Sequence, residues 1–260
     1  MTTGPSYALV TGASMGLGKF FARALAARKQ NLVLVARSKD KLEALANESR
    51  NAQAILAEPV AIDLAVPGAG IQLARQLRER DLRIDLLINN AGFGARGEFF
   101  DLSLERQLQM IHLHNTAVVE LTYQLLPSMI EAKQGGIINV SSMAGWQPVP
   151  YAALYSATKS FLTTFSMALR EELRQSGVRV VTLCPGRLRA DPEEEASQEQ
   201  RQKVPGGEQG YEAVVIETLK KLDGGGGLVI PGRINRWTVR AQRLISPNAV
   251  PKIVARMSRP

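Results

Sequence analysis

Tyr155 and Lys159 are the residues whose types and spacing most directly suggest chemistry. Because they are four residues apart, a helix would place both side chains on one face, a turn apart. A free tyrosine has a pKa of about 10, which is high for proton transfer at neutral pH. A neighbouring lysine ammonium favours the tyrosinate and should lower that pKa. The pair predicts a general acid/base catalyst; the alternative is a packed aromatic beside a solvated charge.

Ser142 stands thirteen residues before Tyr155, at the end of a short apolar run. A hydroxyl there can donate to a substrate oxygen on which negative charge develops. Three aromatic residues near these motifs, Phe93, Trp146 and Tyr151, are candidate walls of a substrate pocket, with core packing as the alternative. Tyr151 is the weaker candidate for the acid/base role, because the residue four positions later is a tyrosine and not a lysine.

A glycine-rich turn, Thr11-Gly-Ala-Ser-Met-Gly-Leu-Gly18, follows the first apolar run and directly precedes a helical pattern. Glycines permit a tight turn and let a pyrophosphate approach the helix N-terminus, where free N–H groups and the helix dipole favour an anion. The spacing differs from the G-x-G-x-x-G of the standard dinucleotide fingerprint, so a turn without a ligand is the alternative. The candidate cofactor contacts in this turn are Gly12, Ser14, Met15, Gly16, Leu17 and Gly18.

The elements that must position these residues form a regular series. Short Val/Ile/Leu runs, apolar on both faces, predict strands over 7–11, 31–36, 54–61, 84–89, 136–141, 178–183 and 228–230. Longer amphipathic segments predict helices over 17–29, 39–51, 69–80, 104–132, 153–175 and 211–222. This alternation of strand and helix predicts a single-domain α/β fold of Rossmann type, with a doubly wound parallel sheet.

Taken together, the motifs resemble the classical type of the short-chain dehydrogenase/reductase family. In the family's order, the chain has the glycine turn, Asn89-Asn90-Ala91-Gly92 after the fourth strand, Tyr155-x-x-x-Lys159, and Pro185-Gly186 after the sixth strand. Ser142 and Asn115 stand at the spacing of the other two members of the family's catalytic tetrad. The similarity extends from about Tyr7 to Gly186, and more loosely to Gly232.

The resemblance implies a role for each residue of this tetrad. Tyr155 would be the acid/base, Lys159 would tune it and bind the nicotinamide ribose, and Ser142 would polarise the carbonyl. Asn115 would hold a water in a proton relay. Further cofactor contacts are implied for Asp63, Leu64, Asn90, Ala91, Gly92, Tyr155, Lys159, Pro185, Gly186 and Leu188. One position departs from the family, because Ala190 stands where a threonine usually binds the nicotinamide carboxamide.

The end of the second strand, Val35-Ala36-Arg37-Ser38, bears on the choice of cofactor. Dehydrogenases that prefer NAD place an acid there for the ribose 2′-OH, and Ala36 occupies that position. Arg37 with no acid beside it suits a 2′-phosphate, through charge-assisted hydrogen bonds. We therefore expect NADP(H), with Arg37 and Ser38 as contacts; a surface arginine at a helix start is the alternative. Met15 stands where many NADP(H)-binding members of the family have a basic residue.

Composition narrows the remaining classes. The single cysteine, Cys184, excludes an internal disulfide, and there is neither a secretory pattern nor an apolar run of ~18 residues. We therefore expect a cytoplasmic protein. His112 and His114 have no cysteine or acidic cluster near them, so we expect no metal site and interpret them as surface or helix-packing residues.

The positive charge is concentrated at the C-terminus. Lys and Arg number 32 against 24 Asp and Glu, and seven of the eight excess charges follow Asp223, after which there is no acid. We expect a catalytic domain over 1–232, a polar lid over 187–210, and a basic amphipathic segment over 233–260. That segment either packs on its own domain or across a dimer, or it lies on an anionic membrane surface. No nucleic-acid motif accompanies the charge.

The predicted function is an oxidoreductase that transfers a hydride between NADP(H) and a carbonyl or secondary alcohol. Resemblance to ketoacyl and steroid reductases favours a hydrophobic ketone or aldehyde as the small-molecule substrate. An epimerase or dehydratase that uses the same site is one alternative, and a non-catalytic NADP(H)-binding or membrane-associated scaffold is another. The family resemblance also implies a homodimer or homotetramer, for which the helices predicted over 104–132 and 153–175 offer an interface.

Overall fold

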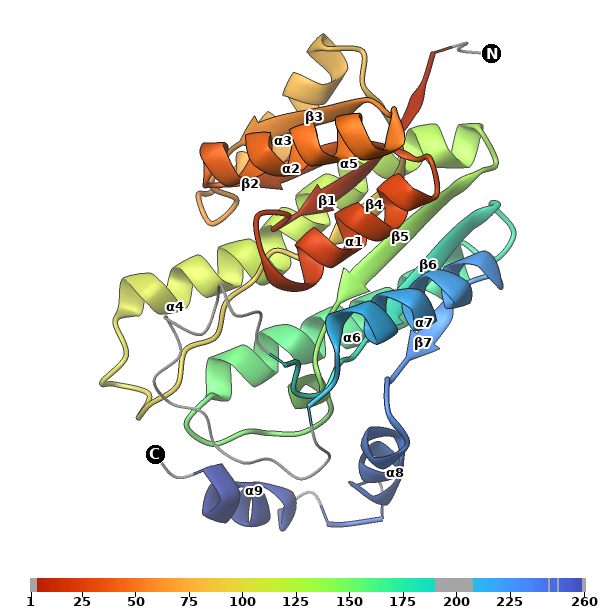
Figure 1. The fold of residues 1–260 in the computed structure, drawn as a ribbon. Coiled ribbons are helices and arrows are strands. Elements are labelled where there is room, and N and C mark those ends of the chain that lie inside the picture. The colour runs from red at the N-terminus through yellow and green to blue at the C-terminus, as the bar shows by residue number, and fades with distance from the viewer. Residues whose placement is uncertain (1–3, 190–207, 243, 247, 259–260) are drawn as a thin grey trace.

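A computed structural model describes residues 4–189, 208–242, 244–246 and 248–258. Its centre is a seven-stranded sheet in the order β3-β2-β1-β4-β5-β6-β7, in which all neighbouring strands are parallel (Figure 1). The strands are β1 (Ser6–Thr11), β2 (Asn31–Ala36), β3 (Ala57–Ala61), β4 (Arg83–Asn89), β5 (Gly135–Val140), β6 (Val178–Leu183) and β7 (Gly227–Val229). The predicted doubly wound α/β fold is confirmed.

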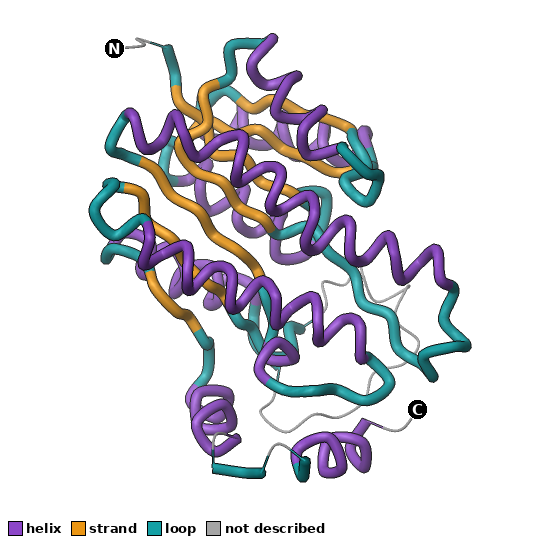
Figure 2. Tube along the Cα trace, turned by 180° about the vertical axis from the view of Figure 1, so that it is seen from behind, coloured by secondary structure: helices purple, strands orange, loops and turns teal. Residues whose placement is uncertain are grey.

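Helices cover both faces of the sheet, and Figure 2 shows one helical layer lying across the strands. The helices α1 (Gly16–Ala27), α2 (Lys39–Gln53) and α7 (Tyr211–Asp223) pack on one face, and α3 (Ala69–Glu79), α5 (Ala117–Glu131) and α6 (Ala153–Glu172) pack on the other. Successive strand residues point to opposite faces, so in β1 Leu9 joins one core and Val10 the other. This double burial explains why the strands are apolar without alternation.

The strand order places the loops that carry the sequence motifs at one edge. β1 and β4 are neighbours, and the chain continues from β1 to β2 on one side and from β4 to β5 on the other. Such a reversal opens a crevice beyond the carboxyl ends of the strands, where ligands bind in doubly wound sheets. The glycine turn after β1 and the loop that begins at Asn90 after β4 both reach this crevice.

The helix predicted as one element over 104–132 contains a π-turn. α4 (Leu104–Ile111) passes into the π-helical segment η1 (His112–Thr116), which continues into α5. A π-turn inserts an extra residue into a helix and rotates the side chains that follow it, and such turns occur frequently at functional sites. Here the turn contains both His114 and Asn115.

The C-terminal segment begins directly after β7. It contains α8 (Arg233–Gln242) and α9 (Val250–Ser258), which lie beyond the carboxyl edge of the sheet (Figure 1). Val239 of α8 packs against Cys184 and Ile230, and Asn235 Nδ2 donates to the carbonyl oxygen of Pro231 at 2.8 Å. α8 is therefore attached to the domain through one of its faces. None of the described helices combines the length and apolar composition that a bilayer crossing requires.

Candidate active site

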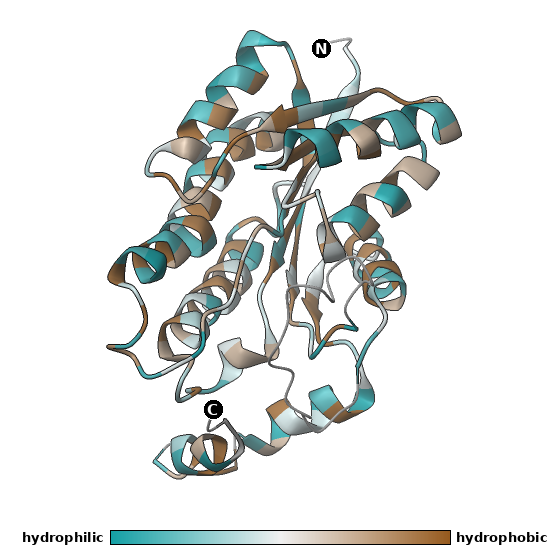
Figure 3. Cartoon of the chain, turned by 60° about the vertical axis from the view of Figure 1, so that its left-hand side comes forward, coloured by the Kyte–Doolittle hydropathy of each residue, from teal (hydrophilic) through white to brown (hydrophobic). Residues whose placement is uncertain are grey.

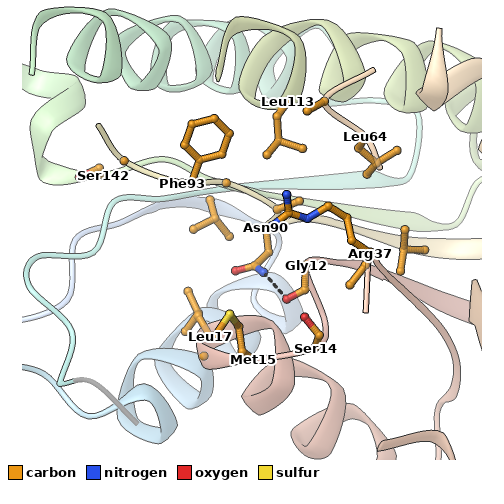
Figure 4. A pocket seen from close by; sticks show the side chains of 18 of the residues that line it. Gly12, Ser14, Met15, Leu17, Arg37, Leu64, Asn90, Phe93, Leu113 and Ser142 are labelled. Atoms are coloured by element: carbon orange, nitrogen blue, oxygen red, sulfur yellow. Dashed lines mark hydrogen bonds between the residues drawn. The ribbon is translucent and has the colours of Figure 1, made fainter. Parts of the chain in front are cut away.

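A cavity of about 590 Å³ occupies the crevice at the carboxyl edge of the sheet (Figure 4). The predicted site residues that line it are Gly12, Ser14, Met15, Gly16, Leu17, Arg37, Ser38, Asp63, Leu64, Asn90, Ala91, Gly92, Phe93, Ser142, Tyr155, Lys159, Pro185, Gly186 and Leu188. The structure thus brings the glycine turn and the Tyr155 motif to opposite parts of one cavity. Gly18, Asn115, Trp146 and Tyr151 are not among its lining residues.

The glycine turn after β1 is locked to the loop after β4. Asn90 Nδ2 donates to the carbonyl oxygens of Thr11 at 2.9 Å and of Gly12 at 3.2 Å, and the latter bond is drawn in Figure 4. Gly12 has φ 66°, and a Cβ on it would lie 2.9 Å from both Asn90 Nδ2 and the Cα of Ala91. Both the backbone conformation and the close approach therefore require glycine.

Gly18 serves packing. A Cβ on this residue would collide with the carbonyl oxygen of Gly12, so its absence lets α1 approach the turn. At the start of α1, Met15 is the N-cap residue with extended backbone, and its side chain makes no capping hydrogen bond. The free N–H groups of the first turn and the positive end of the helix dipole favour the binding of an anion at this end of the cavity.

The end of β2 and the first turn of α2 contribute cations to this part of the cavity. Arg37 and Lys41 both line it, together with Ser38. In Figure 4 the Arg37 side chain extends over the glycine turn. Lys41 was not identified from the sequence, because it belongs to α2 and not to the motif at the end of β2. Asp63 Oδ1 accepts from the backbone N–H of Ala65 at 3.0 Å, which fixes the turn that carries Leu64.

Lys159 and Tyr155 lie at the other end, on α6. Lys159 is only 4% exposed, and its Nζ donates to the carbonyl oxygen of Val140 at 2.9 Å. The Nζ is 5.8 Å from the centroid of the Tyr155 ring. From β5, the Ser141 hydroxyl donates to the carbonyl oxygen of Lys159 at 2.7 Å. The helix turn with the catalytic pair is thereby fixed to the end of β5.

Burial controls the protonation of this pair. It raises the pKa of Tyr155 above its ordinary value, and a hydrogen bond with Ser142 acts in the opposite direction. Burial lowers the pKa of Lys159 to about 8, against a smaller raising effect of Cys184. The net pKa of Tyr155 is therefore raised and not lowered, because the loss of hydration disfavours the phenolate more than its neighbours favour it.

Ser142 is fixed at the end of β5. Its Oγ accepts from the backbone N–H of Ala144 at 3.1 Å and caps the short 3₁₀ helix η2 (Met143–Trp146). The Ser142 hydroxyl acts to lower the pKa of Tyr155, and both residues line the cavity, so the two oxygen-bearing groups lie on one part of its wall. This is the arrangement needed to contact a single carbonyl oxygen.

The π-turn directs His114 and Asn115 differently. Asn115 Nδ2 donates to the carbonyl oxygen of Thr158 at 3.0 Å, and the residue does not line the cavity. His114 is fully buried and its Nε2 accepts from the backbone N–H of Phe93 at 3.1 Å. Burial, with the charge of Lys159 adding to it, lowers the pKa of His114 well below its ordinary value. The sequence interpretation included helix packing for this histidine, and gave no sign of its contact with the loop after Gly92.

The three aromatic pocket candidates have different surroundings. Phe93 lines the main cavity, and the Arg106 guanidinium lies 3.5 Å from its ring centroid. Trp146 packs against the cluster of Cys184, Ile230 and Val239. This contact corresponds to core packing, the alternative to a pocket wall in the sequence analysis. Tyr151, at φ 65°, lines a separate cavity of about 30 Å³ that adjoins Tyr155.

The predicted lid over 187–210 falls largely outside the described residues, as does Ala190. Its two described ends lie together. The N–H of Arg189 donates to the carbonyl oxygen of Gln209 at 2.9 Å, and Arg187 pairs with Glu208 at 3.1 Å. Leu188, between the two arginines, lines the cavity. Within the part of the chain that the structure describes, no group of three or more His, Cys, Asp or Glu side chains is arranged to hold a metal.

A Rossmann-type sheet with a glycine turn, an uncapped helix N-terminus and a Tyr–Lys–Ser group around one cavity defines a nicotinamide-dependent oxidoreductase. The family model for short chain dehydrogenase matches residues 6–201. The chain therefore belongs to the short-chain dehydrogenase family, whose members bind a nicotinamide cofactor and act on small molecules.

Individual relatives support this assignment. The chain is 37% identical over 184 residues to an uncharacterized oxidoreductase of Myxococcus xanthus, covering 71% of this chain and 72% of that protein. It is 36% identical over 183 residues to the human very-long-chain 3-oxoacyl-CoA reductase, and the match covers 69% of this chain and 58% of the human protein. The ketoacyl reductase HetN of Nostoc is 38% identical over 180 residues, and the match covers 68% of this chain and 62% of the Nostoc protein. The matches thus span less than two thirds of the length of the human and Nostoc proteins.

Solved structures agree in fold over nearly the whole chain. A 7β-hydroxysteroid dehydrogenase superposes with a TM-score of 0.85 at 25% identity, covering 96% of each chain. A short-chain dehydrogenase from Sphingobium yanoikuyae, solved with NADPH, superposes with a TM-score of 0.81 at 32% identity, covering 92% of this chain and 93% of that one.

Proposed function

We propose that the protein reduces a hydrophobic ketone or aldehyde with NADPH. The observation that carries the proposal is the shared cavity: Tyr155, Lys159 and Ser142 line the same 590 Å³ space as the glycine turn and Arg37. A dinucleotide bound across it would have its phosphates at the N-terminus of α1 and its nicotinamide beside Tyr155. The cofactor supplies the hydride; the chain supplies binding, orientation and the proton.

The residues at the Tyr155 end then have distinct tasks. Ser142 donates a hydrogen bond to the carbonyl oxygen, which stabilises the negative charge that develops there. Tyr155 gives its phenolic proton to the same oxygen. Lys159 holds a positive charge close to the forming alkoxide and presents donors to the nicotinamide ribose. Asn115 does not line the cavity, so any role in a proton relay would be indirect.

The protonation state of Tyr155 favours the reductive direction. A phenol with its ordinary pKa of about 10 is already protonated at neutral pH, as a general acid must be before it donates, and burial raises that pKa further. Oxidation of an alcohol would instead need the phenolate, which burial disfavours. We therefore propose that reduction of the carbonyl is the faster direction at neutral pH.

Arg37 and Lys41 support NADPH over NADH. Both cations line the cavity at the end of β2, where the 2′-substituent of the adenine ribose would lie. No acid occupies the position after Val35, which is Ala36. The NADPH complex of the 32% identical relative from Sphingobium yanoikuyae agrees with this choice.

The substrate class rests on the relatives. The names of the human and Nostoc relatives describe oxoacyl and ketoacyl reductases, and the Comamonas testosteroni alcohol dehydrogenase at 28% identity is described as specific for bulky-bulky ketones. Phe93 gives this chain's cavity an apolar wall, and Figure 4 shows it on the side of Ser142.

An NADPH-oxidation assay across aldehydes, β-ketoacyl thioesters and bulky ketones tests the proposal. We expect net NADPH consumption with at least one hydrophobic carbonyl, and its loss in Tyr155→Phe. An epimerase or dehydratase on the same site would convert its substrate without net consumption of NADPH, and a scaffold would bind NADPH without turnover. Either result would contradict the proposal.

We also propose that the C-terminal segment contacts an anionic membrane surface. Apolar and polar residues alternate along α8 and α9 (Figure 3). On α8, Ile234 and Trp237 are 56% and 65% exposed, and the Arg240 guanidinium lies 5.7 Å from the Trp237 ring. An exposed tryptophan flanked by arginines is typical of interfacial helices.

Sedimentation with anionic and neutral vesicles tests this contact. Trp237→Ala combined with Arg240→Gln should reduce sedimentation with anionic vesicles, whereas the control Lys220→Gln on α7 should not. Equal sedimentation of all three proteins would contradict the membrane proposal.

A homodimer or homotetramer is proposed through α5 and α6. Tyr123, Phe161 and Met167 on these helices are 76%, 43% and 45% exposed. Light scattering should give at least twice the monomer mass of 28.3 kDa, and a monomer at micromolar concentration would contradict it.

A further inference from the structure

His114 connects two separate parts of the cavity wall. Its Nε2 accepts from the backbone N–H of Phe93 at 3.1 Å, and its Nδ1 lies 2.9 Å from Thr158 Oγ1. Phe93 follows the Asn-Asn-Ala-Gly loop after β4, and Thr158 belongs to the turn of α6 between Tyr155 and Lys159. The imidazole is fully buried, the contact with Thr158 is buried as well, and the contact with Phe93 is partly buried.

The hydrogen-bond directions fix the state of the ring. The backbone N–H of Phe93 can only donate, so Nε2 must be an unprotonated acceptor. A neutral imidazole then carries its proton on Nδ1 and donates to Thr158 Oγ1. Thr158 in turn donates its hydroxyl proton to the carbonyl oxygen of Tyr155 at 2.8 Å. One continuous chain of bonds runs from Phe93 to the backbone of the catalytic tyrosine.

The imidazole also sets how closely the loop approaches the catalytic group. A Cβ on Gly92 would lie 2.8 Å from His114 Nε2 and 3.6 Å from Lys159 Nζ. The ring centroid of His114 is 5.9 Å from that of Phe93 and 5.9 Å from that of Tyr155. The bare glycine therefore lies against the ring, with Lys159 beside it.

We propose that His114 is a positioning residue, which fixes the spacing between the Gly92–Phe93 wall and the helix turn that carries Tyr155 and Lys159. The inference rests on the proposed function, since those two residues matter as a catalytic pair. His114 would thus support the catalytic pair from the position next to Asn115, the residue that the family's tetrad indicates. The side chain of Asn115 points instead to the carbonyl oxygen of Thr158.

An apolar residue of similar size would fill the same space but would not make these bonds. The partly buried N–H of Phe93 would lose its acceptor, and the loop would be free to shift. A shift of about 1 Å between reacting groups can cost on the order of 10²-fold in rate. The functional consequence should therefore appear in kcat more than in the KM for NADPH, because the phosphates bind at the far end of the cavity.

Three substitutions separate the two bonds. The oxygen of Gln can reach the position of Nε2 and accept from Phe93, Asn reaches only the position of Nδ1, and Leu supplies neither group. We expect His114→Leu to lower kcat for carbonyl reduction by about 10- to 10²-fold, with a smaller change in the KM for NADPH. His114→Gln should restore most of kcat, and His114→Asn should restore less. The control is His112→Leu, the same change two residues away in the same π-turn.

A second readout does not depend on activity. Amide hydrogen exchange of Phe93, followed by NMR on the protein without substrate, should be slow in the wild type and in His114→Gln and fast in His114→Leu. Exchange of Phe93 that is equally slow in all three proteins would overturn the inference, even if no substrate had been found. Absence of turnover in the wild type, with the exchange pattern as expected, would instead contradict only the proposed function.

Three kinetic results would also overturn it. These are a folded His114→Leu protein with the kcat of the wild type, a His114→Gln protein no faster than His114→Leu, and an equal loss in His112→Leu. If His114→Leu does not fold, Thr158→Val removes the second bond from the other side. That variant should lower kcat, and Thr158→Ser should restore it; wild-type kcat in Thr158→Val would be equally decisive against the inference.

Discussion

The two ends of the cavity are built from different parts of the chain. At the phosphate end the backbone dominates: Gly12 at φ 66°, the N-terminus of α1, and around them the exposed cations Arg37 and Lys41. At the opposite end the side chains dominate, and Lys159 and His114 are 4% and 0% exposed.

This difference has an electrostatic consequence. Buried titratable groups interact strongly and change their pKa, and at the buried end burial is the leading cause of the shifts of Tyr155, Lys159 and His114. Exposed charges are screened by water and salt. Substitutions at the buried end should therefore affect chemistry and folding strongly, whereas those at the phosphate end should affect cofactor choice by smaller, salt-dependent amounts.

The largest effect is expected for Tyr155→Phe. The variant removes the proton donor and leaves the ring, so kcat for carbonyl reduction should fall by about 10²- to 10⁴-fold, while NADPH affinity changes far less. Steady-state kinetics and NADPH fluorescence titration measure the two quantities. Tyr151→Phe is the matched control, because Tyr151 lines only the adjoining small cavity, and it should keep most of the activity. An unchanged kcat in Tyr155→Phe would contradict the assignment of Tyr155 as the proton donor.

Lys159→Met should change how stability depends on pH. The pKa of Lys159 is lowered to about 8 from an ordinary 10.5, so between these values the unfolded chain binds a proton that the folded chain does not. The contribution of Lys159 to the free energy of unfolding should therefore rise with pH across this window, by about 3 kcal/mol. The variant lacks that contribution.

Urea denaturation of both proteins at pH 7, 8, 9 and 10 measures the difference. Groups that do not interact with Lys159 titrate alike in the two proteins, so the free energy of unfolding of Lys159→Met relative to the wild type should fall from pH 7 toward pH 10. A difference that is constant over this range would mean that burial does not destabilise the lysine charge.

Arg37→Asp tests the phosphate end. A carboxylate there would repel the 2′-phosphate and accept from a 2′-OH, so the ratio of kcat/KM for NADPH over NADH should fall by about 10- to 10²-fold, as expected for loss of a charge-assisted hydrogen bond. The rate with the preferred cofactor should be less affected than in Tyr155→Phe. If the ratio does not change, Arg37 does not select the cofactor.

The smallest effect is expected for Lys41→Gln. This exposed cation should contribute about 1 kcal/mol or less to NADPH binding, and its contribution should fall as salt is raised. NADPH titrations at low and high salt, with Lys39→Gln as the control on the same turn, measure it. A loss of NADPH affinity that does not change with salt would mean that Lys41 acts as a buried charge and not as an exposed one.

Much of the fold and of the cavity lining could be predicted because each depended on local patterns. The strands were indicated by continuous apolar runs, and Asn31–Ala36 and Val178–Leu183 have the predicted bounds. The glycine turn and the Tyr155–Lys159 spacing are short-range geometry, so the sequence alone could place them. The packing of Gly18 against Gly12 could not be predicted in this way, because periodicity does not describe that contact.

What could not be predicted depended on contacts between distant segments. The π-turn at His112–Thr116 rotates His114 toward Phe93, and no helical periodicity in the sequence indicates such a turn. Trp146 turned out to pack against Val239 of α8, nearly a hundred residues later. Lys41 lines the cavity because α2 begins at its edge, which depends on the sheet order.

The sequence by itself determined the alternation of strands and helices, the glycine turn and the residue types of the catalytic group, because these are set by local periodicity and backbone sterics. It also determined that the excess positive charge belongs to the C-terminal segment. Only the tertiary structure decided the protonation of Tyr155 and Lys159 and the orientation of His114. Those properties depend on how much water the packed helices exclude, and that is a property of the assembled core rather than of any segment.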